Sequence, residues 1–494
     1  MDYQSFVNSS RSLLIAPAGY GKTFTIAECM KYTSGKQLIL THTHAGITSI
    51  RNKIKEHKIP AEKYSVETIS SFAQKYVNAY FLGDIPAQET KQYHPFIIEQ
   101  ARAIVSTPIV KKVLSTTYSG IFVDEYQDCT YSQHLLLMEI GSLFPIHILG
   151  DPLQGIFDFN GKEKLVDFKT DLIEFEKFKL NTPYRWNNVG KQGLANSLEI
   201  IRGKLERQEA IDFKEFESCD FHFVSAKLED IRDEDSLLRK CLDRLLRKSV
   251  YESLLFIVPS HFENGVLRGG VTDRSKLKNC FDFQNQVQLL EAIDDESFYK
   301  NAKKIDELYE SIGRAKNKYN KIKKDLLYKY FRKGDVNAWF NDDALKAKRT
   351  KSDQILSIEI KEHLEDFISS PSIFNCKSIL ELFNKKFKFK TARPELYRSV
   401  VSAMESAIFD SKSVEVAMRE QRNRLRQNGR SIKGKCIGTT LLTKGLEFDT
   451  VAIFDLHKFE CPKNLYVALT RSCKKLIIFS DIEIWQAKVS KPTK

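Results

Sequence analysis

The segment APAGYGKT, residues 16–23, constrains the fold more than any other part of this sequence. It follows the apolar run 12–15 and precedes residues that favour a helix. Its glycines let the backbone curl so that several N–H groups point inward, beside the positive N-terminal end of that helix. A phosphate-binding loop has this composition and context, here in a relaxed form because Ala16 replaces the first glycine of the strict pattern. The segment therefore predicts a parallel α/β sheet.

The residues of this loop have separate expected roles in binding ATP and Mg²⁺. Gly19, Tyr20 and Gly21 supply the backbone that surrounds the phosphates. Lys22 would reach the β- and γ-phosphates, and the hydroxyl of Thr23 would hold Mg²⁺. Because sequence and context agree, we predict a nucleotide site here.

Short apolar runs recur along the chain as candidate strands. Most are near-continuous, which is typical of strands buried on both faces of a parallel sheet. The runs are 12–16, 37–41, 120–123, 146–149, 253–258, 450–454 and 475–479. Helical segments such as 23–32 and 45–56 lie between them. Since the runs fall into an early and a late set, we predict an α/β fold with two parallel-sheet cores.

The region 262–430 has a different character. Between Phe298 and Phe331, apolar residues recur at steps of three and four, and many lysines occupy the other positions. This pattern predicts one long basic helix in a helical insertion within the second core. The lysines would either bind a polyanion or solvate an exposed face.

The acidic motif GIFVDEYQD places Asp124 and Glu125 at the end of the predicted strand 120–123. A carboxylate at this position can hold Mg²⁺, and its neighbour can polarise the attacking water. By itself the motif could be an acidic turn after a strand. With a phosphate loop upstream on a parallel sheet, it is interpreted as the Walker B partner of that loop.

Two arginines are candidates to stabilise the charge that develops on a γ-phosphate during transfer. Arg185 lies in LNTPYRWN and Arg471 lies in NLYVALTR. Tyr184, beside the first of them, offers an aromatic face to an adenine. Taken singly, each arginine would more often be structural.

The stretch ILGDPLQGIFDF puts Gln154, Phe157 and Phe159 just beyond a strand end. In an α/β sheet, ligands bind beyond the carboxyl ends of strands, which places the glutamine near the nucleotide. Exposed aromatic rings stack on nucleic-acid bases, so the phenylalanines are candidates for DNA contacts. The alternative is that they cover the edge of a core.

Composition limits the partners and the compartment. The 494-residue chain carries a net charge of +13, which favours nucleic acid as a partner or else a lysine-rich surface. Its nine cysteines include no CxxC pair, which favours reduced thiols and a cytoplasmic location over a structural zinc site. No apolar run approaches the roughly 20 residues of a membrane span, so we expect no membrane partner.

In this order, the motifs resemble those of the UvrD/Rep/PcrA branch of the superfamily 1 helicases. The compact form is similar to helicase subunits of bacterial anti-phage systems such as Gabija. The resemblance implies two RecA-like P-loop NTPase domains that clasp ATP, with a helical insertion in the second. The implied divisions are 1–165, with a small helical insertion near 82–115, then 166–261, the basic insertion 262–430, and 431–494.

The resemblance also implies roles for individual residues. Glu125 would be the catalytic base and Gln154 the γ-phosphate sensor, while Arg185 and Arg471 would be arginine fingers. Three residues would contact the nucleoside, namely Gln4 and Tyr184 at the adenine and Glu447 at the ribose. The implied DNA contacts are His42, Thr43, Ser70, Phe157, Phe159 and Thr439.

The expected function is that of an ATP-dependent translocase on single-stranded DNA, which unwinds duplex DNA in the 3′ to 5′ direction. The alternative is a DNA-stimulated regulatory ATPase that controls a nuclease subunit, for example in anti-phage defence, with little unwinding of its own. A motor directed at RNA is a third hypothesis.

Overall fold

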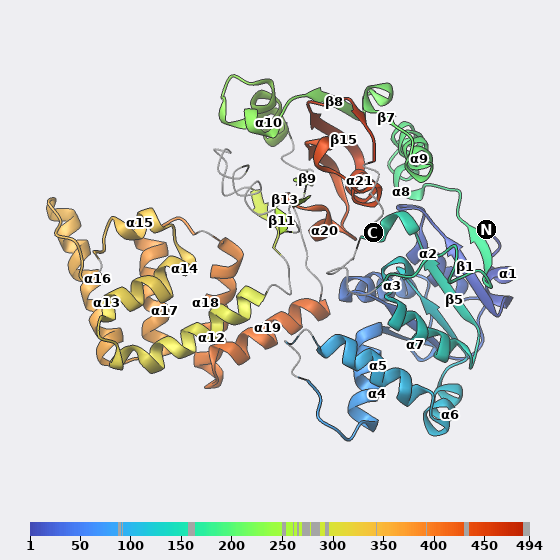
Figure 1. Cartoon of the computed structure of the whole chain (residues 1–494), viewed down its shortest axis with the longest axis horizontal. Coiled ribbons are helices and arrows are strands. Elements are labelled where there is room, and N and C mark those ends of the chain that lie inside the picture. Colours follow the sequence, from blue (N-terminus) through green and yellow to red (C-terminus); the bar gives the residue numbers. More distant parts are fainter. Residues whose placement is uncertain are drawn as a thin grey trace. The chain divides into compact units, whose positions relative to one another are not determined.

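A computed structural model of the chain describes residues 1–86, 90, 92–156, 164–248, 253–259, 261–263, 266–268, 277, 287–291, 296–341, 343–391, 393–428 and 434–487. It contains two compact units (Figure 1). One comprises Met1–Leu290 with Asn428–Lys494, and the other comprises Glu291–Gln427. The larger unit contains both β-sheets of six strands, and the smaller unit is built of helices.

The first sheet has six parallel strands in the order β3-β2-β4-β5-β1-β6. They are β1 (Arg11–Ile15), β2 (Gln37–Thr41), β3 (Tyr64–Thr68), β4 (Gly120–Val123), β5 (Ile146–Gly150) and β6 (Glu176–Lys179). The four predicted runs are confirmed as β1, β2, β4 and β5. The sequence did not predict β3 and β6, because these edge strands are partly exposed and lack continuous apolar runs.

Helices precede β1 and connect most of the strands that come after it. They are α1 (Tyr3–Asn8), α2 (Lys22–Cys29), α3 (His44–Glu56), α4 (Ile69–Tyr80), α5 (Tyr93–Val105), α6 (Pro108–Thr117) and α7 (Tyr131–Gly141). Neighbouring strand residues point to opposite faces of the sheet, so Leu14 and Leu149 join one buried core while Leu13 and Ile148 join another. Burial on both faces explains why these strands have near-continuous apolar sequences.

The second sheet is also parallel, with the order β12-β13-β9-β14-β15-β8. Its strands are β8 (Phe221–Ser225), β9 (Leu254–Ile257), β12 (Val287–Leu289), β13 (Lys435–Gly438), β14 (Phe448–Phe454) and β15 (Ser472–Ser480). The helices of this part are α8 (Tyr184–Asn187), α9 (Gln192–Glu206), α10 (Leu237–Lys248), α20 (Thr440–Thr443) and α21 (Pro462–Leu469). Two short antiparallel pairs, β7 (Ile211–Asp212) with β16 (Ile484–Trp485) and β10 (His261–Glu263) with β11 (Val266–Arg268), complete it.

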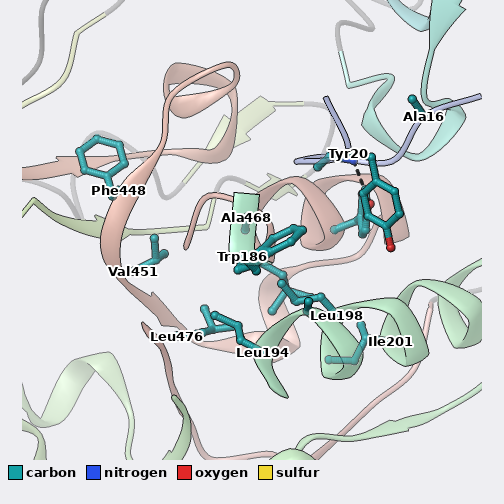
Figure 2. Packing of buried hydrophobic residues seen from close by; sticks show 14 of the residues in the cluster. Ala16, Tyr20, Trp186, Leu194, Leu198, Ile201, Phe448, Val451, Ala468 and Leu476 are labelled. Carbon is teal, nitrogen blue, oxygen red and sulfur yellow. Dashed lines mark hydrogen bonds between the residues drawn. The ribbon is translucent and has the colours of Figure 1, made fainter. Parts of the chain in front are cut away.

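These two sheets confirm the predicted fold class, an α/β chain with two RecA-like domains. Figure 2 shows part of the core near the phosphate loop, where Trp186 packs with Leu194, Leu198 and Ala468. The indole N–H of Trp186 donates to the carbonyl of Ser472 at 2.9 Å. The tryptophan therefore fixes α8, the helix that carries Arg185, against the start of β15.

The smaller unit has its own buried core. Its helices are α12 (Glu296–Ser311), α13 (Lys318–Ile322), α14 (Tyr328–Tyr330), α15 (Lys333–Asn337), α16 (Lys351–Ser369), α17 (Ile373–Glu381), α18 (Pro394–Asp410) and α19 (Val414–Asn428). Among the residues that the structure describes, no helix in either unit combines the length and the apolar character needed to span a membrane.

The prediction of a single long helix over residues 298–331 is wrong. Helix α12 ends at Ser311, and the chain turns before α13 begins at Lys318. Glycine at position 313 weakens the helix, and the side chain of Asn317 accepts from the N–H of Asn320 at 2.9 Å, which starts a new one. The apolar seam instead packs within the core of the unit through Ile305, Leu308, Ile312, Ile322 and Leu326. This segment is therefore a structural part of the unit.

Acidification is expected to destabilise the protein through His147 on β5. Its ring is buried against Phe6 and Phe122, with centroid distances of 5.3 and 4.7 Å, and Nδ1 lies 2.7 Å from Oγ of Ser12. Burial lowers the pKa of His147 from 6.5 to about 4. The unfolded chain therefore binds a proton before the folded chain does, and stability that is present above pH 6.5 is lost towards pH 4.

This effect can reach about 3 kcal/mol, since each pKa unit corresponds to about 1.4 kcal/mol. Melting temperatures measured across this pH range should fall less steeply in His147→Gln than in the wild type. His457→Gln is the matched control, because His457 is exposed at the surface. Parallel melting profiles for the wild type and His147→Gln would contradict the assignment.

Candidate active site

The predicted nucleotide-binding residues gather at the carboxyl edge of the first sheet. Strand β5 pairs in parallel with both β1 and β4, so the loops that follow these three strands emerge side by side. Ligand sites of open α/β sheets form at this edge. The order of the strands therefore brings together the phosphate loop, the acidic motif and the loop of Gln154.

The phosphate loop depends on two glycines with left-handed backbone conformation. Gly19 has φ +76° and Gly21 has φ +91°, values that side chains other than glycine rarely allow. A Cβ at Gly19 would lie 2.9 Å from Cζ3 of Trp186 and 3.0 Å from Cβ of Arg185. Close approach of α8 to the loop thus requires glycine here. Tyr20, between the glycines, is buried.

Lys22 is the first residue of α2, and its side chain is buried at the edge of the sheet. Its Nζ donates to the carbonyl of Ala16 at 3.4 Å and lies 3.9 Å from Oε1 of Glu125. The next residue, Thr23, is partly exposed at the same helix end. An ammonium group and a helix N-terminus at one point form a binding site for phosphate.

Asp124 and Glu125 follow β4 in an unusual backbone conformation. Glu125 has φ +54° although it is not a glycine, and its N–H donates to Oδ1 of Asp124 at 2.9 Å. Such strain is uncommon and clusters at functional sites, where surrounding contacts maintain it. One such contact comes from Gln127, whose Nε2 donates to Oε2 of Glu125.

The two carboxyl groups differ in charge state. Burial, together with the neighbouring charge of Glu125, raises the pKa of Asp124 above its usual range. Burial alone would also raise the pKa of Glu125, but the ammonium groups of Lys22 and Lys444 outweigh it and lower that pKa. Glu125 is thus held ionised. A carboxylate at Asp124 and a hydroxyl at Thr23 are oxygen ligands of the kind that Mg²⁺ prefers, and the cation would offset the buried charge.

Gln154 is buried in the loop after β5 and does not extend freely from it. Its side-chain Nε2 donates to Oδ2 of Asp151 at 2.8 Å, and its backbone carbonyl oxygen accepts from Nζ of Lys444 at 2.6 Å. Lys444 also forms an ion pair with the buried Asp128. Asp151 N–H donates to Oε1 of Gln127 at 2.9 Å, which connects this loop to Glu125.

The two predicted arginine fingers have different surroundings. Arg185 donates through Nη2 to Oε1 of Glu447 at 2.6 Å and through Nη1 to the carbonyl of Thr470, while its buried Nε has no hydrogen-bond partner among the residues that the structure describes. Arg471 is almost fully buried and donates to the carbonyls of Val467 and Leu446 at 2.8 and 3.1 Å. Burial and the nearby Arg185 lower the pKa of Arg471 to about 10, so it stays charged at neutral pH.

The predicted base-binding residues lie on exposed surface near the loop. Tyr184 is 42% exposed, and its Cδ2 would lie 3.3 Å from a Cβ placed at Gly21. Phe24 is also exposed, and its ring centroid lies 6.4 Å from that of Tyr184. Gln4 is exposed on α1. The open aromatic face of Tyr184 beside the phosphate loop is suited to stacking on a base.

Comparison with protein families gives two matches. Residues 3–160 match a family model described as an AAA domain, and residues 353–480 match the model of the viral superfamily 1 RNA helicase core domain. Together, the two matches support a superfamily 1 helicase. The first matched segment contains the phosphate loop and the acidic motif, and the second contains Lys444, Glu447 and Arg471.

Among solved structures, two of Arterivirus nonstructural protein 10 (helicase) are similar to this chain, one of them in complex with DNA. Both are 10% identical and cover 97% of this chain, with TM-scores of 0.34 and 0.29. The chain spans 62% and 61% of the length of those proteins. Comparison with curated proteins finds no match.

The residues predicted to contact DNA occupy several environments. Thr43 is exposed and caps α3 by accepting from the N–H of Gly46 at 3.0 Å, and Ser70 lies in the first turn of α4. Thr439 is buried directly before α20. Phe157 and Phe159 lie outside the described residues. His42 lies within the site, as described next.

The Nε2 atom of His42 lies 3.2 Å from Sγ of Cys129. Burial, and next the charge of Lys444, lower the pKa of His42 to about 4, so the imidazole is neutral at physiological pH. A neutral ring can donate or accept one hydrogen bond at each nitrogen but supplies no charge to a phosphate. Its role in DNA binding stays a prediction.

Four residues of the site were missed from the sequence: Gln127, Arg202, Lys444 and Tyr466. Gln127 and Tyr466 lie inside GIFVDEYQD and NLYVALTR, the motifs of Glu125 and Arg471, and their polar side chains could have identified them. Arg202 lies in the middle of the amphipathic helix α9, where nothing in the sequence distinguishes it from a surface residue. Its partners come from distant parts of the chain.

Proposed function

We propose that the chain is an ATP-driven nucleic-acid motor, which translocates 3′ to 5′ on single-stranded DNA and unwinds duplex DNA. The observation that carries this proposal is the convergence of Lys22, Asp124 and an ionised Glu125 at one sheet edge. Direction and substrate rest on the resemblance to the UvrD/Rep/PcrA branch. The two family matches support a nucleotide-hydrolysing enzyme of this general kind.

In this proposal ATP binds with its phosphates at the loop of Lys22. Bound Mg²⁺, held by Asp124 and Thr23, would neutralise phosphate charge. Lys22 orients the β- and γ-phosphates, and Glu125, which the neighbouring ammonium groups hold ionised, accepts a proton from the attacking water. Within the described part of the chain, the buried Nε of Arg185 has no hydrogen-bond partner, so it can offer a further donor to charge that develops during transfer.

A second candidate function is a motor directed at RNA. The observation that favours it is the match of residues 353–480 to a model of an RNA helicase core. Both substrates present a negatively charged phosphate backbone, which a chain with a net charge of +13 attracts. RNA differs by its 2′-hydroxyl, which a selective protein would read directly.

The deciding experiment measures ATPase rates without nucleic acid and with single-stranded DNA, duplex DNA and RNA. Strand separation is measured in parallel on duplexes with a 3′ or a 5′ overhang. We expect the largest stimulation by single-stranded DNA and unwinding from the 3′ overhang. Stimulation by DNA without unwinding would favour the regulatory ATPase of a nuclease complex, and stimulation by RNA alone would favour the second candidate.

Binding to single-stranded DNA is expected to weaken steeply with salt, because contacts between lysine and phosphate release counterions. We expect the affinity to fall at least about tenfold between roughly 50 and 200 mM salt. Fluorescence anisotropy with a labelled oligonucleotide measures this, and nucleotide binding without DNA is the control. A salt-independent affinity would contradict an electrostatic DNA interface.

A further inference from the structure

The carboxylate of Asp151, at the end of β5, is fully buried and has four donors around it. Oδ2 accepts from Nε2 of Gln154 at 2.8 Å, and Oδ1 accepts from the N–H of Leu153 at 3.2 Å. Arg202 provides the other two, with Nη1 at 2.9 Å from Oδ2 and Nη2 at 2.8 Å from Oδ1. A buried charge needs such compensation, and the guanidinium both neutralises Asp151 and fixes its two oxygens.

Arg202 also contacts Tyr466, on the helix α21 that leads to Arg471. Its Nη1 lies 2.9 Å from the hydroxyl of Tyr466, and its guanidinium carbon lies 5.1 Å from the centroid of that ring. The hydroxyl in turn accepts from the N–H of Ala18 at 3.4 Å. Ala18 belongs to the phosphate loop. A continuous series of hydrogen bonds thus joins Gln154 to the phosphate loop, and Arg202 is its central member.

We propose that Arg202 is a positioning residue for ATP hydrolysis, which holds the loop of Gln154 in register with the phosphate loop. Gln154 can turn towards a γ-phosphate only by leaving Asp151. Because Arg202 still neutralises Asp151 at that moment, the departure of Gln154 leaves no uncompensated buried charge. Through Tyr466, the same guanidinium fixes the N–H of Ala18. This inference rests on the proposed function and adds a residue to it.

The role requires an arginine. Its planar group presents several N–H donors in a fixed fork, so it can bind both oxygens of Asp151 and the hydroxyl of Tyr466 at once. A lysine would keep the positive charge but has a single nitrogen at its end. Arg202→Lys therefore preserves the neutralisation of Asp151 while breaking the connection to Tyr466 or weakening that to Asp151.

The test is steady-state ATPase of the full chain carrying Arg202→Lys. We expect kcat to fall about tenfold while KM for ATP changes less than about twofold, since orientation and not binding is lost. The melting temperature should stay near that of the wild type. Arg207→Lys is the matched control, because Arg207 directly follows the same helix, is exposed, and pairs locally with Glu209.

Tyr466→Phe provides the second variant. It removes the hydroxyl but keeps the ring, and it leaves the pair of Arg202 with Asp151 intact. It therefore tests the connection to Ala18 without leaving a buried charge unpaired. We expect kcat to fall by about threefold or more, with little change in KM. Wild-type kcat in this variant would overturn the proposed connection.

Two further outcomes would overturn the inference: wild-type kcat in Arg202→Lys, or a fall in kcat that merely follows a loss of folded protein. These results differ from a failure of the proposed function. If the wild-type chain hydrolyses no ATP under any condition, both the proposed function and this inference are wrong. If the wild type is active and the variants match it, only the inference is wrong.

Discussion

Lys22→Ala is expected to abolish ATP hydrolysis. The ammonium group of Lys22 is buried at the start of α2 and lies 3.9 Å from Glu125, so its loss removes the positive charge next to the expected phosphates. It also removes a group that keeps Glu125 ionised. Loss of one such electrostatic contact typically costs at least about a hundredfold in turnover. Phosphate release from ATP, with and without single-stranded DNA, measures the effect.

A matched control for this variant is Lys31→Ala. Lys31 lies just beyond the other end of the same helix, is exposed, and pairs with Glu28 at the surface. We expect wild-type turnover in the control. Turnover near the wild-type rate in Lys22→Ala would rule out the assignment of residues 16–23 as the phosphate loop.

Glu125→Gln is expected to stop hydrolysis while nucleotide binding is largely kept. The amide has nearly the shape of the carboxylate but cannot accept a proton from water, and loss of a general base costs about 10²–10⁴-fold. Lys22 and the loop glycines remain in place to bind ATP. Turnover and the affinity for a fluorescent ATP analogue should therefore separate in this variant.

Glu139→Gln serves as the control for Glu125→Gln, because Glu139 lies on α7 in the same domain and pairs at the surface with Lys111. If Glu125→Gln loses nucleotide affinity as strongly as turnover, Glu125 binds nucleotide and does not act as the base. If it keeps turnover, another group accepts the proton.

Much of the fold could be predicted from local sequence. The strands β1, β2, β4 and β5 are apolar on both faces, so their burial is visible in the sequence itself. The break after α12 was missed because the apolar spacing continues across it. The spacing of apolar residues indicates which side chains are buried. The end of α12 and the start of α13 are instead set by Gly313 and by the capping side chain of Asn317.

The candidate site was predicted to a lesser extent, and the reason is again physical. Lys22, Asp124 and Glu125 follow strands in short motifs, so local sequence identifies them. The partners of Asp151 come from Arg202 and Gln127, which are near it only after the chain folds. Pairing across such sequence separations leaves no mark on either segment alone.

The topology around the helical unit has a consequence for how this protein can vary. The unit Glu291–Gln427 is inserted between β12 and β13, which are parallel neighbours in one sheet. Any parallel neighbour must be reached by a crossover, so the chain would need a connection here even without the extra helices. The entropic cost of closing a loop grows slowly with its length. A longer or shorter insertion in this crossover would therefore change the stability of the sheet little. The helical unit can thus change in size while both six-stranded sheets stay unchanged, including the first, whose strands β1 and β4 precede Lys22 and Glu125.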